Sequence, residues 1–396
     1  MTPSGSGFET RPSAAPQPPV RERESVGTFE DLHAAATRMT GLEDFGGDEY
    51  HEPLRVLLDS FASSAGLTGI GNTMERSFLR GALAARLMSE DGFSKHPQHA
   101  DVAIERPIFV TGIQRSGTTA LQRLLYADPG AQGLEMWLTQ VPQPRPPRDT
   151  WDDDPVYAML KQGFEQHHAE NPEMAGIHFM TADTVEEDWQ LLRQSLITTA
   201  YPALAHVPEY LAWLRKADWV PAYERFRRNL QLIGLNDPDK RWVLKNPSHM
   251  DALDALMAVF PDALVIQTHR DPVVAVGSAC SLAATTTRGW STVFVDGQLG
   301  ADVLDLLVAE VRLIAEARGR YDAAQFLDVE YDELVADPVG VVRGVYGSFE
   351  LPWDDAVEDA VRSEHEASRS GPRAPKHEYS LADYGLTEDS VRAAFS

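Results

Sequence analysis

The sequence predicts an α/β fold in which helices cover both faces of a central parallel sheet. From residue 107 onward, short apolar runs rich in β-branched residues alternate with helical patterns. Runs of this length and composition are typical of buried parallel strands. Strands that alternate with helices are joined by crossover connections, which leave the strands parallel and the sheet covered on both sides. We therefore predict an open three-layer α/β fold, with ligands bound beyond the carboxyl ends of the strands. The predicted strands occupy residues 107–113, 242–245, 263–269 and 325–331.

The chain before the sheet divides into two parts. Residues 1–25 are rich in Pro, Ser, Gly and charged residues, a composition typical of a disordered tail. Residues 26–100 carry helical patterns, and we expect them to form a helical N-terminal layer without chemistry of its own. One face of an amphipathic helix in this layer is formed by Leu54, Leu57, Leu58 and Phe61.

The remaining residues, 101–396, are predicted to form the α/β domain. A mostly helical insertion rich in aromatic residues interrupts this domain at about residues 134–239. Large aromatic side chains dominate the area of protein cores. We therefore expect most of these rings to pack in a core and a few to line a pocket.

The charge balance limits the possible ligands. The 396 residues carry 35 basic and 60 acidic side chains, a formal net charge of -25. So acidic a protein repels nucleic acid and anionic membrane surfaces. An anionic ligand would need a local basic pocket, so the arginines and lysines near glycine-rich turns are especially informative.

Cysteine content and hydropathy indicate the cellular compartment to expect. The single cysteine, Cys280, excludes an internal disulfide framework and a cysteine-built zinc site, and its small apolar neighbours predict burial. No stretch approaches the roughly 20 apolar residues of a membrane span, and the N-terminus lacks the apolar region of a signal peptide. We therefore expect a cytoplasmic protein without stable membrane insertion.

The most specific motif lies between Gly112 and Thr119, after the first predicted strand and at the start of a helix. In such a turn the backbone N–H groups converge on one point, and the helix N-terminus adds partial positive charge. Gly117 allows a phosphate to approach the backbone closely, and Arg115 offers a fork of donors. This segment therefore predicts an anion-binding loop.

The loop has the glycine spacing of a nucleoside-triphosphate P-loop but not its lysine. Gly112 and Gly117 match the spacing, whereas Thr118 stands at the lysine position. No strand-end Asp for magnesium is evident, so phosphotransferase chemistry would lack two of its usual charge-stabilising parts. A phosphotransferase using ATP and magnesium and a non-catalytic nucleotide-binding protein stay open as alternatives.

The segment RSGTT resembles the 5′-phosphosulfate-binding loop of sulfotransferases, above all bacterial members with a PRSGTT-type loop and the related tyrosylprotein sulfotransferases. Gln114 stands where proline is usual, a departure expected to alter the stiffness of the loop. The resemblance implies a P-loop-like fold and the donor 3′-phosphoadenosine 5′-phosphosulfate (PAPS), with adenosine 3′,5′-bisphosphate as product. The residues implied to hold the 5′-phosphosulfate are Arg115, Ser116, Gly117, Thr118 and Thr119.

Two further segments extend the resemblance. Arg270 ends a predicted strand in an RDP turn, and Ser278 follows eight residues later, a spacing that sulfotransferases use to bind the 3′-phosphate. Lys245 resembles the lysine that related sulfotransferases place beside the transferring sulfuryl group. A fixed cation there would stabilise the negative charge that develops in the transition state. Tyr331 and Lys376 resemble a strand-end tyrosine region and a C-terminal basic segment that contribute to donor binding.

An acceptor hydroxyl must also lose a proton, which calls for a general base. Glu135 lies 20 residues after Arg115, the distance of the proposed base in tyrosylprotein sulfotransferases. His178 is the alternative, because cytosolic sulfotransferases use a histidine. The acidic cluster at 186–188 is a third option, which we expect instead to favour a helix N-terminus.

The sequence thus predicts metal-free, in-line transfer of a sulfuryl group from PAPS to an acceptor hydroxyl. The abundant aromatic residues of the insertion favour a small-molecule or lipid-like acceptor over a polyanionic polysaccharide, which the net charge would repel. The oligomeric state does not follow from the sequence.

Overall fold

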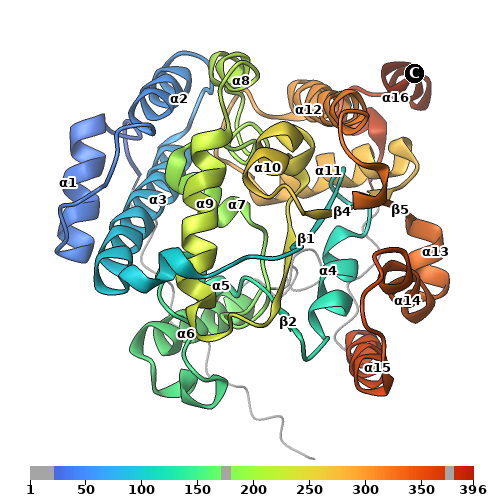
Figure 1. The fold of residues 1–396 in the computed structure, drawn as a ribbon. Helices are drawn as coiled ribbons and strands as arrows, with labels where there is room; N and C mark the ends of the chain where they lie inside the picture. The colour runs from blue at the N-terminus through green and yellow to red at the C-terminus, as the bar shows by residue number, and fades with distance from the viewer. Residues whose placement is uncertain (1–21, 171–179, 371–378) are drawn as a thin grey trace, which may run out of the picture.

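A computed structural model describes residues 22–170, 180–370 and 379–396. Within these residues a five-stranded, wholly parallel sheet has the order β2-β3-β1-β4-β5 (Figure 1). The four predicted strands are all present, and the α/β class is confirmed. The short strand β2 did not stand out in the sequence, since two residues carry no periodicity. The strands are β1 (Ile108–Gly112), β2 (Ala131–Gln132), β3 (Arg241–Lys245), β4 (Leu264–His269) and β5 (Phe326–Glu330).

Both faces of the sheet are buried, as the continuous apolar runs predict. Ile108 and Val110 of the central strand β1 point into one apolar cluster, and Phe109 between them points into the other. The first cluster lies under helices α4, α14 and α15, and the second under α9 to α12 and the N-terminal helices (Figure 1). The sheet is therefore the middle layer of three.

The helices on the α4 side follow β1 and β5. Asp337 caps the N-terminus of α14 by accepting a hydrogen bond from the backbone N–H of Gly340, and proline follows the cap, a favoured first helical residue. These elements are α4 (Thr118–Tyr126), α13 (Tyr331–Ala336), α14 (Pro338–Ser348) and α15 (Asp355–Ser370).

The N-terminal helices occupy the region predicted to be helical. Thr28 caps the first of them, and Gly41 ends it with φ 72°, a left-handed conformation that favours glycine. The third helix runs along the insertion. These helices are α1 (Phe29–Thr40), α2 (His51–Ser63) and α3 (Gly69–Lys95).

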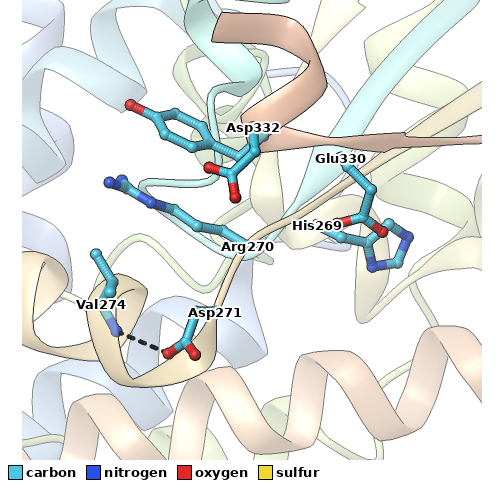
Figure 2. Close-up of a pocket in the computed structure, with 7 residues that line it drawn as sticks. His269, Arg270, Asp271, Val274, Glu330 and Asp332 are labelled. Carbon is cyan, nitrogen blue, oxygen red and sulfur yellow. Dashed lines mark hydrogen bonds between the residues drawn. The ribbon is translucent and has the colours of Figure 1, made fainter. Parts of the chain in front are cut away.

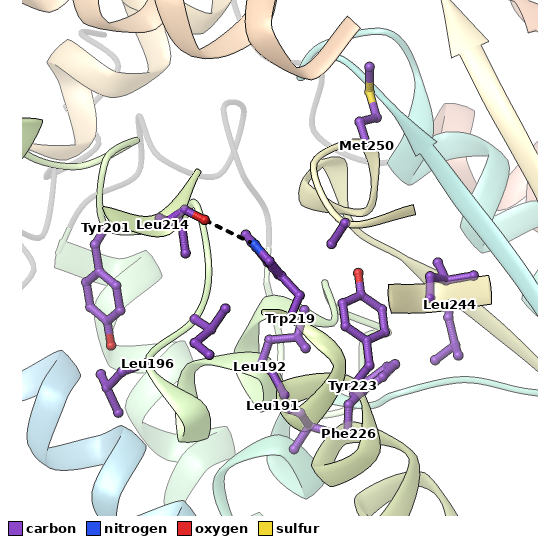
Figure 3. Close-up of a cluster of buried hydrophobic side chains, with 14 of the residues drawn as sticks. Leu191, Leu192, Leu196, Tyr201, Leu214, Trp219, Tyr223, Phe226, Leu244 and Met250 are labelled. Carbon is purple, nitrogen blue, oxygen red and sulfur yellow. Dashed lines mark hydrogen bonds between the residues drawn. The ribbon is translucent and has the colours of Figure 1, made fainter. Parts of the chain in front are cut away.

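The insertion between β2 and β3 packs around its aromatic side chains, as predicted. Trp219, Tyr223 and Phe226 lie in one buried cluster with leucines of α7 and β3 (Figure 3). The indole N–H of Trp219 donates to the carbonyl of Leu214 at 3.3 Å. The helices are α5 (Met136–Gln140), α6 (Pro155–Glu170), α7 (Trp189–Leu192), α8 (Pro208–Leu214) and α9 (Val220–Ile233).

The helices that follow β3 and β4 complete the second outer layer. Cys280 is fully buried in α11, as predicted, and burial raises the pKa of its thiol to about 12. The long helix α12 was not predicted from the sequence. The elements are α10 (Leu253–Val259), α11 (Pro272–Thr286), α12 (Asp296–Arg318) and the C-terminal α16 (Glu388–Phe395).

In the part of the chain that the structure describes, none of the helices combines the length and apolar character needed to cross a membrane.

Candidate functional site

The anion loop lies between β1 and α4, as predicted, and three of its residues have positive φ. Gly112 has φ 138°, Arg115 71° and Gly117 93°. A non-glycine residue in this region is uncommon, and such residues tend to cluster at functional sites. The loop conformation is therefore a specialised one at the carboxyl edge of the sheet, where ligands of such folds bind.

Gly112 allows the loop to pass close to the neighbouring strand β4. A Cβ atom at this position would lie 2.4 Å from the Thr268 hydroxyl and 2.5 Å from the Thr268 carbonyl oxygen. Neither approach is sterically possible, so glycine is needed for both conformation and space.

Ser116 braces the loop from inside. It is fully buried, and its hydroxyl lies 2.6 Å from both the Ile113 carbonyl oxygen and the Thr268 hydroxyl. The sequence pattern predicts that Ser116 donates to the anion, whereas in this structure its hydroxyl connects the loop to β4. The adjacent Thr118 and Thr119 begin α4, at the positively polarised end of that helix.

The two predicted anion-binding segments meet. The Arg115 Nε donates to the Ser278 hydroxyl at 3.1 Å, and an Arg270 Nη donates to the Arg115 carbonyl oxygen at 2.7 Å. Burial, and next the neighbouring Arg270 guanidinium, lower the pKa of Arg115. Neither guanidinium forms an ion pair with a carboxylate among the described residues. Two adjacent cations without a carboxylate partner are costly to keep together unless an anion joins them.

Tyr331 supports Arg270 from the end of β5. The guanidinium carbon of Arg270 lies 3.9 Å from the centre of the Tyr331 ring, a cation–π contact. Gly117 packs against the same ring, because a Cβ atom there would lie 3.0 Å from a ring carbon of Tyr331. Tyr331 therefore contributes to the site by holding Arg270 against the loop.

A cavity of about 200 Å³ opens beside this stack (Figure 2). Arg270 extends along it, and the Asp271 carboxylate accepts from the backbone N–H of Val274, which caps α11. The lining residues are His269, Arg270, Asp271, Val274, Glu330, Tyr331 and Asp332.

The C-terminal segment reaches the same region. The Tyr379 hydroxyl donates to the Val274 carbonyl at 3.1 Å, and its ring packs over Gly277. Tyr379 also acts electrostatically on Arg115. Lys376, three residues earlier, lies outside the described residues, as does His178.

Lys245 ends β3 next to the loop and is almost completely buried, with 1% of its side chain exposed. Its ammonium group forms an ion pair with Glu187, with 2.6 Å between Nζ and Oε1. A buried ammonium of this kind requires an anionic partner. Glu187 supplies that partner from the insertion and is 24% exposed.

Glu135, the preferred base candidate from the sequence, lies in a different polar network. It is 2% exposed, its Oε2 accepts from the Arg145 Nε at 3.1 Å, and its Oε1 accepts from the Tyr126 hydroxyl at 2.9 Å. Arg145 also donates to Asp237 and to the Gly133 carbonyl, so the network ties the start of the insertion together. Both Glu135 oxygens are therefore engaged in structural contacts.

Comparison with known proteins identifies the family. A sequence model of the sulfotransferase family matches residues 107–355, which contain the sheet and the strand-end residues Arg115, Lys245, Arg270 and Tyr331. The chain belongs to the sulfotransferase family.

Solved sulfotransferases share the fold. The structure of sulfotransferase STF1 from Mycobacterium tuberculosis is 55% identical, with a TM-score of 0.89, and the match covers 94% of this chain and all of that one. Sulfotransferase STF9 from Mycobacterium avium is 29% identical, with a TM-score of 0.84 over 94% of this chain and 96% of that one. The three-layer fold is thus that of mycobacterial sulfotransferases.

A characterised relative is more distant. The omega-hydroxy-beta-dihydromenaquinone-9 sulfotransferase Stf3 of Mycobacterium tuberculosis is 28% identical over 263 residues, which is 62% of this chain. The same percentages hold for Stf3 of Mycobacterium bovis. The matched part spans 63% of the relative, less than two thirds of its length.

One ion pair beside the candidate site did not stand out in the sequence. Glu187 belongs to the acidic cluster that we expected to favour a helix N-terminus. The cluster does directly precede a helix, α7, and Glu187 in addition pairs with Lys245, 58 residues away, while its neighbour Asp188 pairs with His249. Asp188 precedes α7 but forms no side-chain cap with it. The three successive acidic residues were the only sequence signal for these ion pairs. Nothing in the neighbouring sequence indicates that their partners lie on β3 and in the segment after it.

Proposed function

We propose that this protein transfers the sulfuryl group of PAPS to the hydroxyl group of a lipid-like acceptor. The observation that carries the proposal is the meeting of Arg115, Ser278 and Arg270 at the carboxyl edge of a parallel sheet. These residues follow two strands, β1 and β4. The loop after β1 resembles the 5′-phosphosulfate site of sulfotransferases, and the segment after β4 resembles their 3′-phosphate site. Their proximity suits a nucleotide with one phosphate group on each side.

The residues present fit such a donor. Arg115 with the α4 N-terminus would hold the 5′-phosphosulfate, and Arg270 with Ser278 would hold the 3′-phosphate. When bound, the donor supplies an activated sulfuryl group on a phosphate leaving group. Both ends of the donor are anionic, which favours binding to two guanidinium groups that have no carboxylate partner in the described part of the chain.

Lys245 would stabilise the charge that develops during transfer. Its ammonium group lies at the end of β3, adjacent to β1 in the sheet, and is shielded from solvent. A fixed cation in a water-poor site is worth more than one in bulk water, because the local dielectric is low. The family assignment favours this chemistry over the phosphotransferase alternative.

A lipid-like acceptor is supported by the relative Stf3, whose name specifies a hydroxylated menaquinone. Most aromatic residues of the insertion are core residues and give no support of their own. Trp189 is different, since it lies two residues after Glu187, is partly exposed and contacts the partly exposed Phe78, with 6.4 Å between the ring centres. Trp189 thus offers partly exposed apolar surface two residues from the carboxylate that pairs with Lys245, and Phe78 extends it.

Isothermal titration calorimetry with adenosine 3′,5′-bisphosphate tests the proposed donor. The protein should bind the bisphosphate more tightly than ATP, with or without magnesium, and Arg115→Ala should weaken binding at least tenfold. Tighter binding of magnesium ATP would instead support a phosphotransferase. Binding without turnover on any hydroxyl acceptor would indicate a non-catalytic nucleotide-binding protein.

A further inference from the structure

The residues around Lys245 point to the group that removes the acceptor proton. Glu187 is the carboxylate in direct contact with Lys245, at 2.6 Å. Its charge also acts on Arg115 in the anion loop. Glu187 is therefore in direct contact with the cation at the end of β3 and acts electrostatically on the one in the loop after β1.

Exposure separates the two glutamates that could act as base. Lys245 is buried, whereas a quarter of the Glu187 side chain reaches solvent, so Glu187 borders the open side of this ion pair. Glu135 is 2% exposed, and Arg145 and Tyr126 each occupy one of its oxygens. The Glu187 carboxylate is therefore more accessible to an incoming hydroxyl than that of Glu135.

A buried polar chain fixes the segment that carries Glu187. The backbone N–H of Asp188 donates to the Lys245 carbonyl at 3.0 Å, as a strand partner would. The Asp188 carboxylate lies 2.8 Å from His249 Nε2, and the Tyr223 hydroxyl lies 2.7 Å from His249 Nδ1. All three side chains are fully buried. This arrangement holds the backbone on both sides of the Glu187–Lys245 pair in one geometry.

We propose that Glu187 is the general base, with Asp188, His249 and Tyr223 as positioning residues. This inference rests on the proposed function. The acceptor O–H bond breaks and its proton passes to a Glu187 carboxylate oxygen. The electron pair of the acceptor oxygen forms the new O–S bond, and the S–O bond to the 5′-phosphate breaks with its electron pair on the phosphate oxygen. Lys245 remains beside the charge that develops.

The test compares two acceptors that differ in their need for a base. Dodecan-1-ol keeps its proton at mildly alkaline pH, whereas p-nitrophenol is largely ionised at pH 8, where both are assayed, and has little need of a general base. With radiolabelled PAPS, Glu187→Gln should lower transfer to dodecan-1-ol by about 10²–10⁴-fold, the usual contribution of a general base. Transfer to p-nitrophenol should fall far less. A structural defect would lower both rates together, which would overturn the inference.

Further variants test whether a loss of activity reflects misfolding, and whether Glu135 is the base. Glu187→Asp keeps the charge and should retain part of the dodecan-1-ol activity, while Glu224→Gln on the exposed face of α9 should behave as wild type. If Glu135→Gln shows the selective loss of dodecan-1-ol transfer and Glu187→Gln does not, Glu135 is the base and our inference is wrong.

A binding measurement separates this inference from the proposed function. Because Glu187 places negative charge near Arg115 and Lys245, Glu187→Gln should bind adenosine 3′,5′-bisphosphate several-fold more tightly than wild type. Weaker binding would overturn the placement of Glu187 beside the donor. Failure of the wild type to bind the bisphosphate would refute the proposed function itself. Bisphosphate binding without transfer to either probe would refute the acceptor class and the base together.

Discussion

The guanidinium group of Arg270 donates a hydrogen bond to the backbone carbonyl of Arg115, at 2.7 Å, and stacks on the ring of Tyr331. One side chain thus connects the ends of β4 and β5 with the loop after β1. Arg270 has two roles in the proposed donor site, since it offers positive charge and also holds the loop conformation. Substitutions at this position should therefore affect both ends of the donor.

Arg270→Ala should weaken binding of adenosine 3′,5′-bisphosphate by about 10- to 100-fold, since hydrogen bonds to charged groups contribute about 1.5–3 kcal/mol. Binding of adenosine 5′-phosphate should weaken less. This ligand has no 3′-phosphate, so it loses only the support that Arg270 gives to the anion loop. Calorimetry on both ligands measures the two effects. Arg343→Ala is the matched control, an exposed arginine on α14 paired with Glu358. Equal affinity of Arg270→Ala and wild type for the bisphosphate would contradict the assignment.

Gly112→Ala should destabilise the protein and weaken donor binding. The added Cβ would lie 2.4 Å from the Thr268 hydroxyl, and the backbone has φ 138°. Strain of this kind costs on the order of 1–3 kcal/mol, plus the displacement of β4. Chemical denaturation measures the loss. Gly163→Ala on the exposed side of α6 meets no atom within 4 Å and should instead be stabilising by about 0.5–1 kcal/mol. If both substitutions changed the free energy of unfolding equally, Thr268 would have to move aside to accommodate the added Cβ atom without cost.

Glu75 should make the stability fall as the pH rises from about 5 to 8. Burial raises the pKa of this carboxyl to about 8, and neither oxygen has a hydrogen-bond partner within the described part of the chain. The folded state then holds a proton that the unfolded state releases above its ordinary pKa of 4.5. Because the unfolded state binds fewer protons in this window, the free energy of unfolding decreases with pH.

Glu75→Gln should remove this slope and be the more stable protein near pH 7. Unfolding by urea at several pH values between 5 and 8 measures the slope in both proteins. Glu105→Gln, at an exposed position, should leave it unchanged. A wild-type stability that is flat or rising over this range would show that Glu75 has a partner in solution.

The sheet and the conformation of the anion loop were predictable because their signals are local. The apolar runs around Phe109 and Val265 and the glycines of the loop report on their own conformation. The proximity of Arg115 and Arg270 was also predictable from the sequence, because the carboxyl ends of parallel strands meet at one edge of the sheet. The resemblance to sulfotransferases then supplied the roles of these residues.

Side-chain partners within the insertion were not predictable. Glu187 and Glu135 are both acidic residues beside apolar ones in the sequence, and nothing local separates their environments. Their difference arises from distant partners, since Lys245 reaches one and Arg145 the other. Such pairings depend on tertiary packing, which a single sequence does not encode as a pattern. Our proposal that Glu187 is the base therefore depended on the folded arrangement.

Lys245→Met should lower kcat with little change in affinity for adenosine 3′,5′-bisphosphate. A cation that acts mainly on charge developing during transfer stabilises the transition state more than the bound ground state. Removing one such group typically costs about 10²–10³-fold in kcat. Single-turnover transfer from PAPS measures the chemical step directly. A large loss of bisphosphate affinity with unchanged kcat would place Lys245 in ground-state binding instead.

His249→Gln tests whether the buried chain acts through Glu187. The substitution replaces an imidazole that touches Asp188 and Tyr223, so it should loosen the Glu187 segment and lower kcat about tenfold, with bisphosphate affinity preserved. In the Glu187→Gln background the same substitution should have no further effect on transfer to dodecan-1-ol, because residues that act as a unit are non-additive. Tyr223→Phe removes only the outer hydrogen bond and should give a smaller loss of the same kind. Additive losses in the double variant, or equal losses with p-nitrophenol, would mean that His249 serves general stability and does not position the base.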